Sequence, residues 1–138
     1  MNGSDPRRFV AYCSTQSHSS TSRAAQMCLM KIRSIEPDLD GILTGQLIKE
    51  QMIKDIDAGL IPSFVIATLG TTGLCAFDDI KSITEVCREL ETKTRPIWIH
   101  VDSAYAGSML VLPDKRGKLL DGVDQVNTFN TNLSKGKR

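Results

Sequence analysis

Residues 63–72 read SFVIATLGTT, a mainly apolar run that ends in a glycine and two threonines. A run of this length without polar alternation is typical of a parallel strand that is buried on both faces of a sheet. A second run of the same kind, IWIHV, fills residues 97–101 directly after Pro96. The sequence therefore predicts two buried strands at the centre of the fold.

The segments around these two runs alternate between helical and extended patterns. Three helices are predicted over residues 20–30, 45–58 and 79–90, with a short helix near residues 115–120. Three further strands are predicted over residues 9–12, 32–35 and 126–131. This alternation is the signature of an α/β domain with a mainly parallel sheet flanked by helices.

Residue types at the helix ends predict where each helix begins. The expected N-caps, whose side-chain oxygens can accept a hydrogen bond from a free backbone N–H group, are Ser19 or Ser20, Thr44 and Asp78. The apolar stripe of the second helix consists of Leu47, Ile48, Met52, Ile53 and Ile56. This stripe is expected to face the sheet.

The composition excludes several classes of partner. Seventeen basic and sixteen acidic residues leave a net charge of +1, which predicts neither a nucleic-acid nor a membrane partner. No apolar run approaches the ~20 residues that a membrane-spanning helix needs. The four cysteines form no C-x-x-C pair and only two histidines accompany them, so reduced thiols in a cytoplasmic protein are expected rather than a zinc site.

The predicted elements do not complete a covered sheet. No element precedes the strand at residues 9–12, and no helix follows the strand at residues 126–131. Because a parallel sheet is normally covered on both faces, we expect residues 1–138 to be one partial domain. Its ends, residues 1–8 and 133–138, are expected to be disordered.

Polar residues follow three of the predicted strands. Thr71 and Thr72 come after the first buried run, Asp102 directly follows the second, and Asn132 and Lys135 follow the last strand. In open α/β sheets, ligands bind outside the carboxyl ends of the strands. We therefore expect a threonine, an aspartate and a lysine to converge on one crevice.

Each of these residues also has an interpretation that involves no ligand. Asp102 can be a helix cap or a turn residue, the two threonines can be loop residues, and Lys135 can be a solvated charge in a basic tail. His18 can be a polar residue at a helix start. His100 lies close to Asp102, but two potential metal ligands without a third disfavour a metal site.

Four motifs in order favour the functional interpretation. They are YCSTQSHSS at residues 12–20, ATLGTT at 67–72, IHVDSAYAG at 99–107 and FNTN at 129–132. Together they resemble the group II pyridoxal-phosphate-dependent decarboxylases, which include the aromatic-L-amino-acid, tyrosine and histidine decarboxylases. The resemblance runs over residues 9–132 and is greatest to the aromatic-L-amino-acid decarboxylase branch. It implies a partial large domain of the fold-type-I pyridoxal-phosphate enzymes.

The resemblance implies that three residues contact the ring of pyridoxal 5′-phosphate. His18 would stack on one face of the ring, and Ala104 would pack on the other. Asp102 would form a charge-assisted hydrogen bond to the ring nitrogen and favour its protonated form. The protonated ring is the electron sink on which this chemistry depends.

Three further residues are assigned by the same resemblance. Thr72 would form a hydrogen bond near Asp102 and the cofactor, Asn132 would help to hold the phosphate, and Lys135 would be the Schiff-base lysine. The family has proline and histidine before this lysine and an aromatic residue after it, whereas this chain has Leu133, Ser134 and Gly136.

The activity implied by the resemblance is the pyridoxal-phosphate-dependent removal of carbon dioxide from an L-amino acid, aromatic in this branch, by a homodimeric carboxy-lyase. The family's upstream phosphate loop, its small domain and its mobile loop are absent, so the isolated chain is expected to be inactive. One alternative is a non-catalytic remnant that binds a full-length relative or has no ligand. A nucleotide-binding oxidoreductase is disfavoured, because no G-x-G-x-x-G follows any predicted strand.

Overall fold

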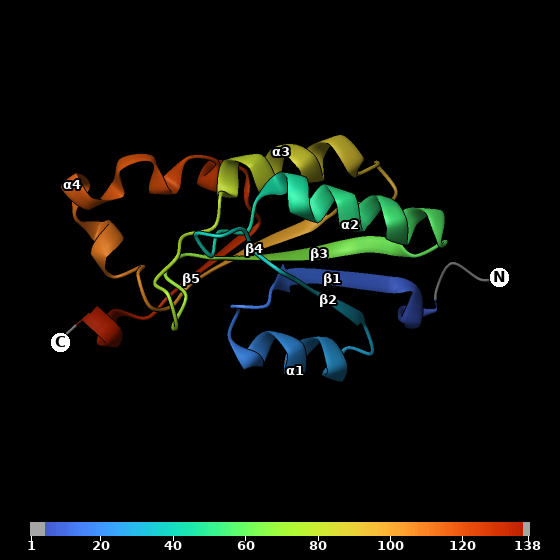
Figure 1. The fold of residues 1–138 in the computed structure, drawn as a ribbon, viewed down its shortest axis with the longest axis horizontal. Coiled ribbons are helices and arrows are strands. Elements are labelled where there is room, and N and C mark those ends of the chain that lie inside the picture. The colour runs from blue at the N-terminus through green and yellow to red at the C-terminus, as the bar shows by residue number, and fades with distance from the viewer. Residues whose placement is uncertain (1–4, 137–138) are drawn as a thin grey trace.

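A five-stranded sheet forms the centre of the computed structural model, which describes residues 5–136 (Figure 1). The strand order is β2-β1-β3-β4-β5, and all four pairs of neighbouring strands are parallel. The strands are β1 (Phe9–Ser14), β2 (Lys31–Ile35), β3 (Ile61–Thr68), β4 (Trp98–Ser103) and β5 (Thr128–Thr131). The predicted α/β fold with a parallel sheet is confirmed.

Helices cover the two faces of this sheet unequally. The helices are α1 (Ser19–Met27), α2 (Gly45–Asp57), α3 (Ile80–Leu90) and the short α4 (Pro113–Arg116). Figure 1 shows α2 and α3 side by side on one face and α1 on the opposite face. The main hydrophobic core therefore lies on the side of α2 and α3, where side chains such as Val65, Ile99, Met52 and Ile83 are fully buried.

The partial cover of the α1 face is visible in β4. Ile99 and Val101 point into the main core and are fully buried, whereas His100 and Asp102 alternate with them and are only partly buried. The sequence predicted that this strand is buried on both faces, and that prediction is wrong for the α1 face. The alternation brings polar side chains to the more open face of the sheet.

Two of the predicted helix caps are wrong by one residue. The N-cap of α1 is His18, whose Nδ1 accepts a hydrogen bond from the Ser20 backbone N–H at 3.2 Å. The N-cap of α3 is Asp79 rather than Asp78, because Asp79 accepts from the Ser82 N–H at 3.1 Å. Thr44 does stand at the N-cap of α2, but its side chain makes no capping hydrogen bond.

The inner face of α2 differs from the predicted apolar stripe. Ile48 and Met52 are fully buried as expected, whereas Ile53 and Ile56 are 43% and 42% exposed. The helical period instead places Asp55 on the buried face. A carboxylate in this position needs partners, since an unpaired buried charge is very costly.

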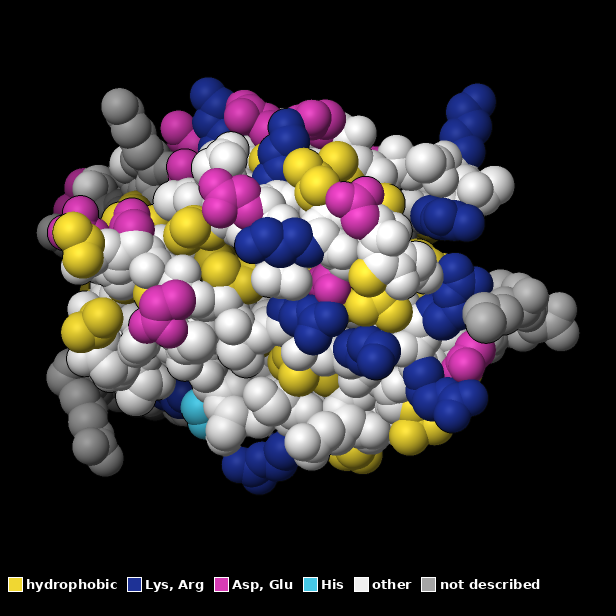
Figure 2. Space-filling view, turned by 45° about the vertical axis from the view of Figure 1, so that its right-hand side comes forward, with side chains coloured by type: hydrophobic (Ala, Val, Ile, Leu, Met, Phe, Trp, Pro, Cys, Tyr) yellow, Lys and Arg dark blue, Asp and Glu magenta, His cyan; other side chains and the backbone are white. Residues whose placement is uncertain are grey.

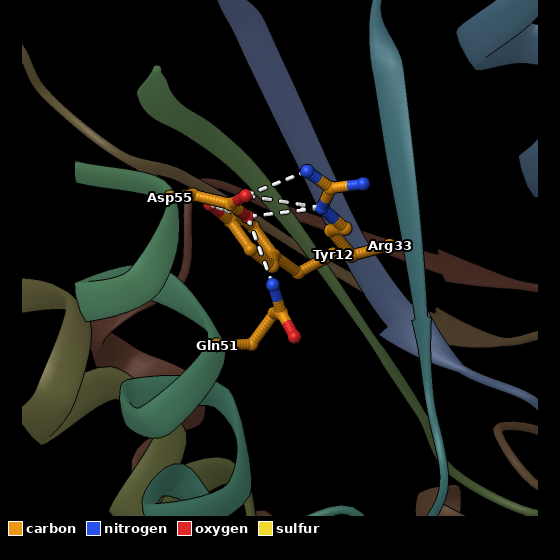
Figure 3. Close-up of polar contacts among 4 residues, drawn as sticks. All are labelled: Tyr12, Arg33, Gln51 and Asp55. Atoms are coloured by element: carbon orange, nitrogen blue, oxygen red, sulfur yellow. Dashed lines mark hydrogen bonds and ion pairs between the residues drawn. The ribbon is translucent and has the colours of Figure 1, made fainter. Parts of the chain in front are cut away.

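Asp55 obtains these partners from three elements (Figure 3). The Tyr12 hydroxyl of β1 donates to it at 3.0 Å, and the Arg33 guanidinium of β2 forms an ion pair with it at 2.7 Å. Gln51, one turn earlier in α2, donates from 3.4 Å. Burial alone would raise the pKa of Asp55, but the hydrogen bonds from Arg33, Tyr12 and Gln51 lower that pKa below its usual value.

Short 3-10 helices occupy the described parts of both chain ends, Pro6–Arg8 and Leu133–Gly136. The rest of the two ends that the sequence predicted to be disordered, residues 1–4 and 137–138, lies outside the described residues.

Charges of both signs share the face shown in Figure 2. No helix within residues 5–136 combines the length and apolar character that crossing a membrane requires.

Replacement of Asp55 by alanine is expected to lower the free energy of unfolding by about 2–4 kcal/mol, because Tyr12 loses its buried acceptor and Arg33 loses its ion pair. The loss should stay below that of a fully buried pair, since the Arg33 side chain is 38% exposed. Urea unfolding of Asp55→Ala and of Asp57→Ala, an exposed position on the same helix, measures this difference. Equal stability of the two variants would contradict the assignment.

The acid sensitivity of this cluster is a second readout of the same experiment. Because the pKa of Asp55 is lowered in the folded state, its stabilisation is present above about pH 4 and is lost as the pH falls through the folded-state value. The Asp55→Ala variant should therefore lose less stability than the native chain when both are acidified.

Candidate functional site

A hollow of about 210 Å³ lies at the carboxyl ends of the strands. Its walls include His18, Thr72, Asp102, Ala104 and Lys135, which lie in or after the carboxyl ends of four different strands. These are five of the six residues that the sequence assigned to one site. The parallel arrangement of β1, β3, β4 and β5 brings them together, since all four strands end at the same edge.

Asp102 is held at the centre of this site by two donors. The Ala104 backbone N–H donates to its Oδ1 at 3.0 Å, and Asn130 Nδ2 approaches the same oxygen at 3.4 Å. Within residues 5–136, no hydrogen bond is recorded to the other oxygen, Oδ2. Asp102, in β4, therefore accepts a hydrogen bond from the turn that follows the strand and also presents one free carboxylate oxygen to a ligand.

His18 is both a helix cap and a wall of the hollow. Its Nδ1 accepts from the Ser20 N–H, and the Ser20 hydroxyl lies 2.8 Å from the same nitrogen. An accepting Nδ1 carries no proton, so the neutral ring is protonated at Nε2. The start of α1 thus fixes the orientation of the imidazole, and the exposed ring remains available for a planar ligand.

The two threonines after β3 have different surroundings. Thr71 is buried, and its Oγ1 accepts from the Ala76 N–H at 3.0 Å, which closes the loop. Thr72 is exposed and lines the hollow, and no hydrogen bond joins it to Asp102 in the described structure. Gly70 precedes them with a φ of +83°, and a Cβ atom there would lie 2.8 Å from that of Ala106.

Asn132 directly follows β5, and Lys135 lies in the short 3-10 helix Leu133–Gly136 that comes next. Lys135 is exposed and lines the hollow, whereas Asn132 does not contribute to its walls. The Asn132 Oδ1 instead accepts from the Ser134 N–H at 3.0 Å and from its hydroxyl at 2.6 Å. The asparagine that lines the hollow is Asn130, which is paired in register with Asp102 on the neighbouring strand.

Sequence reasoning also missed several other wall residues: Gln16, Ser20, Thr68, Gly70, Tyr105 and Asn130. For Asn130, the signal was available as the two-residue period of a strand, which places Asn130 and Thr128 on one face. The remaining residues lie at the end of β3, in loops or at a helix start, where single-residue placement depends on tertiary contacts.

Asp78 holds the backbone next to the site in place. This buried residue accepts from the Thr68 N–H at 2.7 Å and from the Leu43 N–H at 2.9 Å. It therefore fixes the end of β3, where the site loop begins. Burial raises the pKa of Asp78 to about 6, although the two backbone donors act in the opposite direction.

The residues around the hollow suit a planar ring that carries a protonated nitrogen and a group that reacts with an amine. Asp102 offers an acceptor to a protonated ring nitrogen, and His18 offers a planar contact. Lys135 supplies an amine, and the small Ala104 leaves room for a close approach. Pyridoxal phosphate fits this donor set. In the described part of the chain, no three His, Cys, Asp or Glu side chains are grouped as metal ligands.

Comparisons with known proteins identify the family and the fold. Residues 3–136 match the family model described as the pyridoxal-dependent decarboxylase conserved domain. The chain is 43% identical over 128 residues to the aromatic-L-amino-acid decarboxylase of Manduca sexta, and 44% identical over 128 residues to the histidine decarboxylase of Drosophila melanogaster. Each match covers 93% of this chain but only 24% and 14% of the two relatives.

A solved structure gives the same result at the level of the fold. The Oryza sativa protein TDC, crystallised with PLP and tryptamine, superimposes with a TM-score of 0.87 at 34% identity. The superposition covers 96% of this chain and 27% of that protein. The chain therefore spans about a quarter of the matched structure.

Asp78→Asn is expected to lower the free energy of unfolding by about 1–3 kcal/mol, because the amide nitrogen would face a backbone N–H donor. The matched control is Asp79→Asn, since asparagine caps a helix as well as aspartate does. Denaturant unfolding of both variants at pH 8 measures the contrast. Equal losses in the two variants would indicate that Asp78 is only a helix-start residue.

The pH dependence of stability tests the charge of Asp78. Its pKa is raised in the folded state to about 6, so the folded chain binds more protons than the unfolded chain between about pH 4 and pH 6. The contribution of this group to stability is therefore greatest at low pH and falls as the pH rises through about 6. Unfolding curves over this range should show that fall in the native chain and not in Asp78→Asn.

Proposed function

The chain belongs to the pyridoxal-dependent decarboxylase family, and we propose on this basis that its protein is a carboxy-lyase that removes carbon dioxide from an L-amino acid with pyridoxal 5′-phosphate as cofactor. The observation that carries the proposal is the geometry of Asp102. One of its carboxylate oxygens is held by two donors, and the other is free at the edge of a hollow that also contains His18 and Lys135.

The free oxygen of Asp102 would hold a proton on the ring nitrogen of the cofactor. A carboxylate in hydrogen-bond contact favours the charged form of its partner. The two donors on Oδ1 restrict rotation of the carboxylate, so Oδ2 keeps a constant direction. When bound, pyridoxal phosphate supplies the electron sink that accepts the electron pair left by departing carbon dioxide.

The other residues that line the hollow would bind the cofactor and orient its ring. His18 would lie against the ring, with its orientation fixed by Ser20. Ala104 would allow the ring to approach from the opposite side, and the Thr72 hydroxyl would donate or accept beside it. The phosphate contact assigned to Asn132 stays a prediction, and it requires this side chain to exchange its bonds to Ser134 for the phosphate.

Lys135 would hold the cofactor through its amine, and the amine of the substrate would take the place of the lysine amine on the cofactor. Its neighbours Leu133, Ser134 and Gly136 depart from the pattern that the resemblance implies. The lysine nevertheless lines the hollow, which supports the catalytic reading over a non-catalytic remnant. A protein that binds no cofactor would be the remnant instead.

We further propose an aromatic substrate, a homodimeric assembly and a cytoplasmic location for this protein. An aromatic substrate is supported by the resemblance of the four motifs and by a structural neighbour that was crystallised with tryptamine. The homodimer is proposed from the resemblance alone. A cytoplasmic location is supported by four cysteines that are all unpaired.

Asp102→Ala in the full-length protein that contains this chain should abolish decarboxylation and strongly weaken retention of pyridoxal phosphate, because the protonated ring nitrogen loses its counter-charge. Carbon dioxide release from aromatic L-amino acids and equilibrium dialysis of the cofactor measure the two effects. Asp57→Ala, at an exposed position away from the hollow, is the control. Near-normal turnover of Asp102→Ala would refute the assignment.

His18 requires variants that separate stacking from helix capping. His18→Asn retains a capping side chain but has no ring, whereas His18→Phe retains a planar ring but cannot cap. We expect His18→Phe to bind pyridoxal phosphate more tightly than His18→Asn, and His18→Asn to melt at the higher temperature. If both variants had the same cofactor affinity, His18 would be a helix cap without a ligand.

A further inference from the structure

A second hollow, of about 380 Å³, adjoins the first on the α1 face of the sheet. It shares Ser20, Asp102 and Asn130 with the first hollow, and its wall also contains His100. His100 precedes Asp102 by two residues in β4, so both side chains project from the same face of the strand. The proposed function gives His100 no role.

A chain of hydrogen bonds joins His100 to the edge of the sheet. His100 and Thr128 are paired in register on β4 and β5, and His100 Nδ1 lies 2.8 Å from Thr128 Oγ1. The indole Nε1 of Trp98 donates to the same Oγ1 at 3.2 Å. Thr128 therefore links a tryptophan and a histidine that lie on one face of the neighbouring strand.

The direction of these bonds follows from the donors available. An indole N–H can only donate, so the Thr128 oxygen accepts from Trp98. The hydroxyl has a single proton, and among the described residues His100 Nδ1 is its only recorded acceptor. Donation to Nδ1 makes this nitrogen an acceptor and leaves the ring proton on Nε2. A Thr128 hydroxyl that donates to Nδ1 therefore favours the neutral imidazole.

The surroundings of His100 act mainly in the same direction. Burial lowers the pKa of His100 below its usual value, and the negative charge of Asp102 opposes this. The Phe64 ring of β3 lies with its centroid 6.5 Å away, and Cys28 from α1 lines the same hollow. Among the described residues that line this hollow, Asp102 and Cys28 are the only other titratable groups.

We propose that Trp98 and Thr128 hold His100 as a neutral positioning residue, so that the Asp102 carboxylate is reserved for the protonated ring nitrogen of the cofactor. A cation at His100 would attract this carboxylate and repel the ring cation. The inference rests on the proposed function, in which Asp102 meets the ring nitrogen. It adds a residue that acts through Asp102 and need not touch the cofactor.

The first test needs no cofactor. The chain contains two histidines, so NMR titration of the 138-residue chain should give two imidazole signals, with His18 as the internal reference. Thr128→Val removes the hydroxyl from a near-isosteric side chain and should raise the pKa of His100 by about 0.5 to 1. Thr128→Ser keeps the hydroxyl and should leave this pKa close to the native value.

Trp98→Phe provides an independent variant if Thr128→Val does not fold. It removes the competing indole donor, so that both acceptor positions of the hydroxyl oxygen are open to a protonated Nδ1, and the pKa of His100 should rise here too. Circular dichroism melts identify the variants that fold. An unchanged His100 pKa in both Thr128→Val and Trp98→Phe would overturn the proposed chain.

The second test asks whether the hydrogen bonds among Trp98, Thr128 and His100 affect the role of Asp102. Dissociation constants for pyridoxal phosphate are compared between Thr128→Val and Thr128→Ser, each in the full-length protein that contains this chain, at pH 6 and at pH 8. We expect Thr128→Val to bind about threefold to tenfold more weakly at pH 6, where its His100 is partly charged, and equally at pH 8. A raised His100 pKa without this difference would overturn the role in the site. If the full-length protein that contains this chain binds no pyridoxal phosphate, the proposed function fails, and the titration still tests the hydrogen bonds among Trp98, Thr128 and His100.

Discussion

The site depends on the parallel register of β3, β4 and β5. Thr68 is paired with Asp102, and Asp102 is paired with Asn130, so three strands end in side chains on one line across the sheet. A slip of one residue in β4 would turn Asp102 into the main core and Val101 toward the ligand. The main core prevents this slip, because Ile99 and Val101 are fully buried beneath α2 and α3. The hydrophobic pattern of β4 thus also fixes the direction of its carboxylate.

The sequence was sufficient for the elements and their class, because apolar runs and helical periods are local signals. Five of the six predicted site residues line the hollow. Thr72, Asp102 and Lys135 were expected because parallel strands deliver the residues at their carboxyl ends to one edge, whereas His18 and Ala104 came from the resemblance alone. Sequence reasoning failed where a choice between adjacent residues depends on distant donors. Asp78 is buried rather than a cap because the N–H groups of Leu43 and Thr68 need an acceptor there, and no local pattern shows that need.

The unequal cover of the sheet explains why the prediction that β4 is buried on both faces is wrong. On the α2 and α3 side, apolar residues pack as the pattern predicts, whereas α1 covers only part of the opposite face (Figure 1). His100, Asp102, Thr128 and Asn130 lie on this more open face, where polar side chains can bond to each other across β4 and β5. The polar positions of β4 therefore belong to the chemistry of the site, and its apolar positions belong to the core.

The placement of Lys135 shows how a departure from the expected pattern can keep the geometry. The chain has Leu133 and Ser134 where the resemblance implies proline and histidine. Asn132 nevertheless turns the backbone after β5, because its side chain accepts from Ser134 and its carbonyl accepts from the Lys135 N–H at 3.2 Å. This turn directs Lys135 toward the hollow that contains Asp102. Asn132 shapes the path of the chain to the lysine, while Asn130, on the strand itself, contacts the carboxylate.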